Sequence, residues 1–254
     1  MDSVDVVRAR VLKGVRHGFL GRGGGVSQGE VAGLNVGLGA GDDPAAVAEN
    51  RRRARVAVAP EAQLVTLYQV HSAECIVVTS PWNDADRPRA DAIVTDRPGL
   101  LLGILTADCA PVLLADPDAG VIGAAHAGWK GAIGGVVQAT VAAMEQLGAQ
   151  RSRIRAAIGP SIAQGSYEVD DAFRDRFCAK DPQNGAYFAG GKPGHWHFDL
   201  EGFVASQLAA SGVEAAESLH LDTYGAPQRF YSFRRSCHRN EASYGRQISL
   251  ISLD

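Results

Sequence analysis

Cysteine and methionine are scarce in this chain, and long apolar runs are missing. Four cysteines are scattered among 254 residues without a Cys-x-x-Cys pair, and there are two methionines. No apolar stretch approaches the ~18 residues that a membrane-spanning helix needs. The N-terminal segment also lacks the basic and apolar regions of a signal peptide. We therefore expect a cytoplasmic protein without disulfides, in which each cysteine is a free thiol, a metal ligand or a small buried side chain.

The charge pattern excludes two classes of partner. The formal net charge is −3, charged residues make up 21% of the chain, and no long basic block or acidic tail is present. Nucleic acid and membrane surfaces are therefore not expected partners. We expect a monomer or a weak homodimer.

Strand-like segments outnumber helical ones and do not alternate with them regularly. Apolar runs bounded by Pro, Gly or Asp predict strands at 7–15, 63–71, 74–79, 90–96, 99–108, 110–117, 120–126, 153–159, 217–224, 229–235 and 246–253. Apolar residues at steps of three and four predict helices at 44–58, 132–147, 170–178 and 199–210. This pattern favours an α+β fold with a mixed or antiparallel sheet. No linker, repeat or composition break divides residues 1–254, so we expect a single domain.

Three residues with metal-binding or nucleophilic side chains each end an apolar strand-like run: His71, Cys109 and His126. Taken singly, each is most simply a core residue. Together, two imidazoles and a thiolate form a three-ligand set of the kind that catalytic zinc uses, with a fourth position left open. Cys109 and His126 could instead be a nucleophile and its base, as in a cysteine hydrolase, with His71 or Asp108 orienting the imidazole.

A copper enzyme is a weaker alternative. The segment His195-Trp196-His197 resembles the His-x-His pairs of copper proteins. A multicopper oxidase needs histidines for a trinuclear cluster as well as a Cys/His centre, however, and the chain has seven histidines in all. The composition therefore argues against a true laccase.

Three segments have a composition suited to anion binding. Residues 21–27, Gly-Arg-Gly-Gly-Gly-Val-Ser, combine flexible backbone with the guanidinium of Arg22. The turn from Gly128 to Gly131 leads into a predicted helix, whose first N–H groups could face an anion. A C-terminal segment also clusters arginines at 234, 235, 239 and 246. Each segment could equally be a solvated loop.

Taken together, these motifs resemble the bacterial YfiH-like family. The segments are HGFLGRGGGVS (17–27), LNVG (34–37), QVH (69–71), ADAIVTD (90–96), GILTADCAPVLLADP (103–117), GAAHAGWKG (123–131), AAIGPSI (156–162), SYEV (166–169) and FYSFRR (230–235). This family was formerly called multicopper polyphenol oxidase or laccase-domain. It is now regarded as zinc-containing purine nucleoside phosphorylases with adenosine deaminase activity.

The resemblance implies a fold, an activity and a set of site residues. The fold is two β-sheets packed together and flanked by helices, similar to toxin-type cysteine deamidases. The activity is phosphorolysis of purine nucleosides, with one zinc ion held by His71, Cys109 and His126; copper is the less favoured metal. Asp108, next to a ligand, is a candidate for proton transfer. Expected contacts to nucleoside and phosphate come from Arg22, Asn35, Gly128, Trp129, Arg235 and Arg246.

The chain departs from the family pattern at three positions. Gly21 stands where threonine is usual, and Ser161 and Asp222 stand where cysteine is usual. None of the three is an expected metal ligand. Asp222 is the departure that we expect to alter the substrate pocket.

Overall fold

The computed structural model describes residues 3–253 as an α+β architecture in which two mixed sheets pack face to face. The first sheet has the strand order β1-β2-β14-β6-β3. Its strands are β1 (Val6–Val7), β2 (Arg16–Leu20), β14 (Gln247–Ser252), β6 (Leu100–Thr106) and β3 (Gln63–Thr66). The second sheet has the order β13-β9-β7-β8-β5-β4. Its strands are β13 (Ala215–Ser218), β9 (Arg155–Ile158), β7 (Ala110–Asp116), β8 (Val121–Ala127), β5 (Ala92–Thr95) and β4 (Cys75–Val77).

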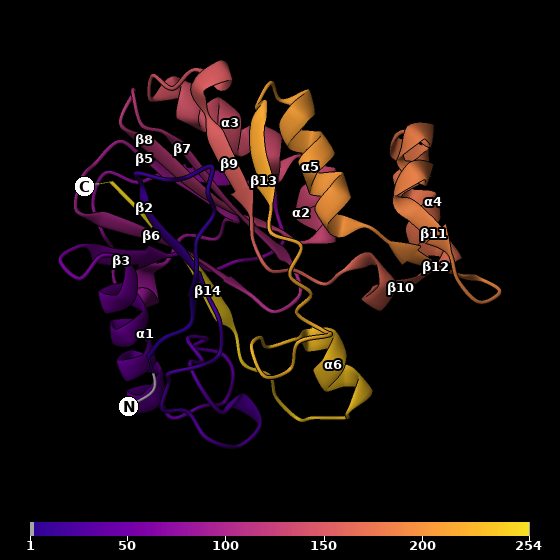
Figure 1. Cartoon of the computed structure of the whole chain (residues 1–254), viewed down its shortest axis with the longest axis horizontal. Helices are drawn as coiled ribbons and strands as arrows, with labels where there is room; N and C mark the ends of the chain where they lie inside the picture. The colour runs from indigo at the N-terminus through magenta and orange to yellow at the C-terminus, as the bar shows by residue number, and fades with distance from the viewer. Residues whose placement is uncertain (1–2, 254) are drawn as a thin grey trace.

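Helices cover the outer faces of both sheets (Figure 1). α1 (Pro44–Val58) packs on the first sheet, whereas α2 (Trp129–Gly134), α3 (Val136–Gln146) and α5 (Leu200–Ala210) cover the second. A smaller unit beside this body contains α4 (Asp171–Lys180) and a three-stranded sheet of order β10-β12-β11. Its strands are β10 (Glu168–Asp170), β12 (His195–Phe198) and β11 (Phe188–Gly190). The expected packed sheets and flanking helices are confirmed.

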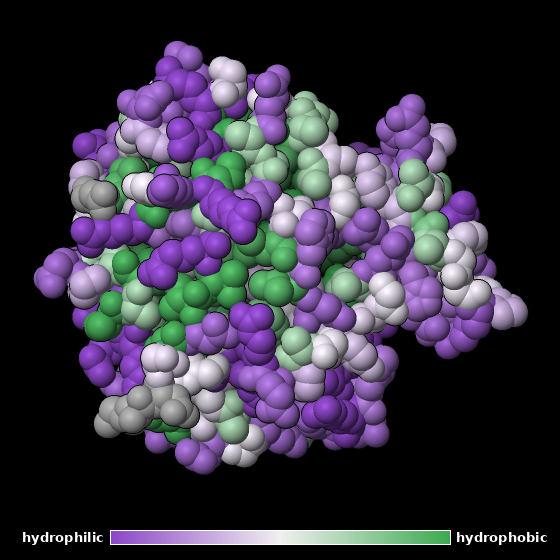
Figure 2. Space-filling model, in the orientation of Figure 1, coloured by the Kyte–Doolittle hydropathy of each residue, from purple (hydrophilic) through white to green (hydrophobic). Residues whose placement is uncertain are grey.

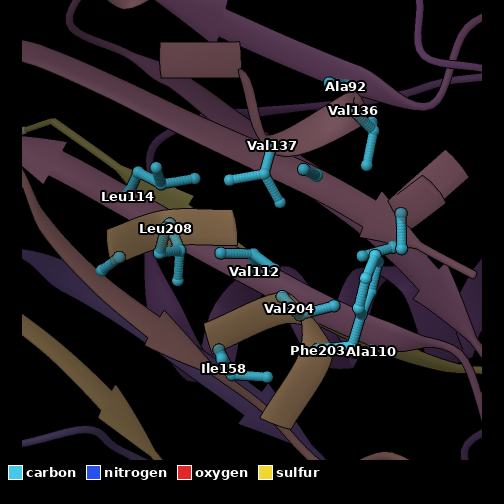
Figure 3. Close-up of a cluster of buried hydrophobic side chains, with 14 of the residues drawn as sticks. Ala92, Ala110, Val112, Leu114, Val136, Val137, Ile158, Phe203, Val204 and Leu208 are labelled. Carbon is cyan, nitrogen blue, oxygen red and sulfur yellow. The ribbon is translucent and has the colours of Figure 1, made fainter. Parts of the chain in front are cut away.

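The central strands are mostly apolar because both of their faces are buried. Along β7, Val112 and Leu114 belong to the apolar cluster under α3 and α5, whereas Leu113 and Ala115 belong to the cluster between the sheets. Successive side chains of a strand point to opposite faces, so a strand between two layers needs apolar residues at every position. Figure 3 shows side chains from the second sheet, α3 and α5 meeting in the first of these clusters.

The surface of the smaller unit is mainly hydrophilic, whereas apolar side chains gather nearer the middle of the larger body on the face shown in Figure 2. The phenylalanines of the smaller unit are buried instead. Phe173, Phe177 and Phe198 lie within one continuous apolar cluster with the core under α3 and α5. Aromatic packing therefore joins the two parts.

Within residues 3–253, no helix combines the length and apolar character needed to cross a membrane.

Several expected elements need correction. The helix expected at 132–147 is two helices, because Gly135 adopts a left-handed conformation with φ +97° between α2 and α3. The strand expected at 229–235 is wrong: Ser232 caps the N-terminus of α6 (Phe233–His238) by accepting from the Arg235 N–H. The expected strands at 7–15 and 217–224 are also too long, since β1 ends at Val7 and β13 at Ser218.

Candidate metal centre

His71, Cys109 and His126 come together although 55 residues of chain separate the first from the last. His71 lies in the loop after β3, Cys109 immediately before β7, and His126 in β8. One ligand atom from each lies within 4.8 Å of the others. The Cys109 Sγ and the His71 Nε2 are 3.9 Å apart. These distances define a candidate site for one metal ion.

Strand register explains why Cys109 and His126 meet. β7 and β8 are antiparallel and pair Ala110 with Ala127, so Cys109 lies opposite Gly128 at the end of the hairpin. β5 and β8 pair Ala92 with Ala125, so the residue before β5, Asp91, lies opposite His126. Residues that end neighbouring strands therefore share one edge of the second sheet.

The backbone on this edge is strained. His71 and Asp108 have φ values of +62° and +89°, in the left-handed region that side chains other than glycine rarely adopt. Such conformations persist where surrounding contacts hold them, and they cluster at functional sites. Asp108 is held by a 2.6 Å hydrogen bond from the Thr223 hydroxyl and another of 2.6 Å from the Arg234 N–H. One strained residue, His71, is therefore a candidate ligand, and the other, Asp108, precedes the candidate ligand Cys109.

Electrostatics couple the three side chains. Burial alone would raise the pKa of the Cys109 thiol, but the His126 and His71 imidazoles outweigh burial and lower the pKa to about 6. Burial opposes the charged form of His126, yet Cys109 and Asp91 raise its pKa to about 9. By contrast, burial raises the pKa of the Cys75 thiol to about 12. Of these two cysteines, Cys109 therefore has the thiolate character that a metal ligand or nucleophile needs.

Asp91 is a site residue that the sequence reasoning missed. Its fully buried carboxylate accepts a 2.8 Å hydrogen bond from the His126 Nδ1, and its second oxygen accepts from the loop that carries His71. The available signal was its place in Ala90-Asp91-Ala92, where a carboxylate begins a strand whose other residues are buried. A buried acid needs a partner, and ligating histidines commonly have a carboxylate on their other nitrogen.

Two members of the metal group, His71 and Cys109, line a cavity of about 630 Å³. Trp129, Phe173, Tyr167 and Phe233 supply aromatic surface, and Trp129 packs on Phe173 at 5.0 Å between ring centroids. Lys130, Arg176 and Arg234 add cationic side chains to the lining, and among residues 3–253 none of the three has a carboxylate within ion-pair distance. Asp108 also lines this cavity; burial raises the pKa of its carboxyl group. The cavity thus combines aromatic surface with unpaired positive charge.

The other expected substrate residues lie elsewhere. Arg22 and Arg235 line a separate pocket of about 220 Å³. Their guanidinium groups donate to backbone carbonyls, among them those of Ala32 and Thr223. Asn35 is buried, and its side-chain carbonyl accepts from the backbone of Arg246 at 3.0 Å.

Arg246 itself donates to the Tyr244 hydroxyl at 3.0 Å and lines neither pocket. Asp222 is also absent from the cavity lining. It accepts from the backbone N–H of Ala163 and from the Ser166 hydroxyl, and so holds the loop after β9.

Gly128 contributes space rather than a polar contact. A Cβ atom at this position would lie 2.8 Å from the Cys109 Sγ and 2.9 Å from the His71 Cδ2. Any side chain would therefore displace a candidate ligand.

We expect Gly128→Ala to weaken metal binding at least ~10-fold, as loss of ligand orientation typically does. The measurement is a zinc titration against a chromophoric chelator. Gly134→Ala in α2 is the matched control, since the nearest atom to its Cβ would be 3.8 Å away. Equal zinc affinities for the two variants would contradict this reading of Gly128.

Comparison with known proteins identifies the class. Residues 16–254 match the family model described as "Multi-copper polyphenol oxidoreductase laccase". The chain therefore belongs to this laccase-like family, which includes YfiH and DUF152 proteins, and the expected family is confirmed.

Individual relatives sharpen this assignment. The chain is 43% identical over 248 residues to "Purine nucleoside phosphorylase ORF3" of Streptomyces griseus, with 97% of each chain covered. It is similar to the crystal structure of YlmD from Geobacillus stearothermophilus, with a TM-score of 0.90 and 31% identity over 100% of this chain and 97% of that one. A hypothetical YfiH protein from Bacillus licheniformis gives a TM-score of 0.87 and 29% identity, with 100% and 97% covered.

Proposed function

We propose that this protein is a zinc-dependent purine nucleoside phosphorylase. The observation that carries the proposal is a His-Cys-His group at the wall of a cavity lined by aromatic rings and unpaired cations. In the reaction, phosphate forms a bond to the sugar C1′ while the bond from C1′ to the purine nitrogen breaks, and the base leaves with a proton. Relatives named purine nucleoside phosphorylase at 41–43% identity support this assignment.

The donor set fits zinc. His71, Cys109 and His126 would hold the ion, and the Asp91 contact on the Nδ1 of His126 leaves its Nε2 for the metal. Zinc bound there would supply a Lewis acid at the cavity wall. Copper is the second candidate because of the family's description. A single group of two histidines and one cysteine suits one ion, however, rather than the cluster of a multicopper oxidase.

Phosphate binding is assigned to a cationic side chain that lines the cavity. Arg234 lines the cavity, and its backbone N–H donates to Asp108, the neighbour of Cys109. A guanidinium is suited to phosphate because it presents several N–H donors in a fixed plane. A phosphate role for Arg22 and Arg235, in their separate pocket, stays a prediction.

The purine base is assigned to the aromatic side chains that line the cavity. Trp129 is backed by Phe173 and lines the cavity, so its indole can stack on a flat ring. Asp108 also lines the cavity and is next to Cys109, so we assign it proton transfer to or from the substrate. The same arrangement makes adenosine deamination a proposed second activity, in which water replaces the amino group at the purine C6.

The deciding experiment is an incubation of the zinc-loaded protein with adenosine and phosphate. We expect adenine and ribose 1-phosphate, with inosine as the product if deamination also occurs. Chelation of the metal should stop both reactions, and zinc should restore them. Failure of the zinc-loaded protein to form any of these products would refute the proposal.

We expect Arg234→Gln to raise the KM for phosphate by about 10-fold or more, because a hydrogen bond to a charged group contributes roughly 1.5–3 kcal/mol. The measurement is initial rate against phosphate concentration at saturating nucleoside. Arg155→Gln, an exposed position on β9, is the control. An unchanged KM for Arg234→Gln would show that Arg234 does not bind phosphate.

A second candidate is a cysteine hydrolase. One observation favours it: the His126 imidazole lies between two interacting groups, the Cys109 thiol and the Asp91 carboxylate. Metal dependence separates the two functions. Such a hydrolase stays active in chelator, whereas the proposed phosphorylase does not.

A further inference from the structure

We propose that Asp91 is the positioning residue of the metal centre and that its two carboxylate oxygens orient both histidine ligands. Among residues 3–253, the side chains grouped to hold one metal ion are those of His71, Cys109 and His126. Asp91 is not in this group, so it acts on the metal through these ligands. The proposal rests on the proposed metal-dependent function and adds a residue to it.

The first oxygen orients His126. The Asp91 Oδ1 accepts from the His126 Nδ1 at 2.8 Å, and the backbone N–H of His126 donates to the Asp91 carbonyl at 2.7 Å. The ring and the backbone of His126 are thus tied to the same residue. With Nδ1 engaged, the remaining ring nitrogen is the one free to ligate.

The second oxygen holds the loop on both sides of His71. The Asp91 Oδ2 accepts from the Val70 N–H at 3.1 Å, from the Ser72 N–H at 2.6 Å and from the Ser72 hydroxyl at 2.9 Å. His71, between these donors, has a left-handed φ of +62°. A strained conformation of this kind needs contacts that fix its neighbours. One buried carboxylate therefore links the loop after β3 to β8.

Asp116 supplies a matched comparison. Its carboxylate is also fully buried and accepts from the backbone N–H groups of Ala119 and Gln150 and from Arg153. None of these partners carries or flanks a metal ligand. Replacing Asp116 therefore tests the effect of losing a buried carboxylate alone. Replacing Asp91 tests in addition the effect of losing ligand orientation.

The test compares zinc affinity and the absorption of bound Co²⁺ for the wild type, Asp91→Asn and Asp116→Asn. We expect Asp91→Asn to weaken zinc binding about 10–100-fold, as loss of an outer-shell partner does, and to change the Co²⁺ bands. Asp116→Asn should stay within about twofold of the wild type. Unfolding by urea, measured alongside, reports the stability that each variant loses. Affinity within twofold of wild type for Asp91→Asn would overturn the proposal.

A metal-free measurement separates this proposal from the proposed function. In the metal-free wild type, the amide hydrogens of Val70 and Ser72 should exchange slowly because Asp91 accepts from both. Rapid exchange at both amides would show that Asp91 does not hold the His71 loop. This result would overturn the proposal even if Asp91→Asn does not fold. Slow exchange in a wild-type protein that binds no zinc would support the role of Asp91 in holding the His71 loop, but it would refute the metal-dependent function.

Discussion

We expect replacement of Cys109 by alanine to abolish tight zinc binding and to lower the rate of the proposed phosphorolysis by more than about 100-fold. The reason is that Cys109 supplies the one sulfur of the His-Cys-His group. Even the loss of an outer-shell partner costs roughly 10–100-fold, and the loss of a ligand costs more. Metal content and the initial rate with adenosine and phosphate are measured on the same preparation. Cys237→Ala, at an exposed cysteine, is the control and keeps both values.

Alkylation distinguishes the ligand role from a nucleophile role. In the metal-free protein, iodoacetamide should modify Cys109 before Cys75, because their thiol pKa values are about 6 and about 12. Zinc should protect Cys109, since a ligated thiolate is not free to attack. Full phosphorolysis by Cys109→Ala, or equal alkylation with and without zinc, would contradict the metal site.

The second large effect is on stability. Phe177→Ala lowers the free energy of unfolding by about 3–5 kcal/mol, the usual cost of truncating a buried phenylalanine. The Phe177 ring is fully buried, with its centroid 4.6 Å from that of Phe198 and 5.1 Å from that of Phe203. The measurement is urea unfolding at equilibrium. Val56→Ala, at a side chain 45% exposed on α1, is the control and should change stability by at most ~0.5 kcal/mol.

The same substitution should weaken substrate binding. Phe177 packs on Phe173 at 5.1 Å and on Trp129 at 6.5 Å between ring centroids, and both of these residues line the cavity. We therefore expect a higher KM for the nucleoside below the denaturation midpoint, with a smaller change in the KM for phosphate. Unchanged values of both would show that the cavity wall does not depend on this aromatic cluster.

The sequence by itself determined the local features. The central strands were predictable because their apolar runs are bounded by turn residues, such as those between β7 and β8. His71, Cys109 and His126 were recognisable because they end such runs and occur in motifs specific to the family. Each of these signals spans only a few consecutive residues, so recognising it needs no knowledge of the packing.

The tertiary structure decided which distant residues meet. Asp91 joins the site only because β5 pairs with β8 and places it opposite His126. Arg234 and Arg235 are adjacent in sequence, yet α6 directs the first to the cavity and the second to another pocket. Strand pairing and helix orientation depend on contacts between remote segments, and for this reason composition and spacing could not assign these roles.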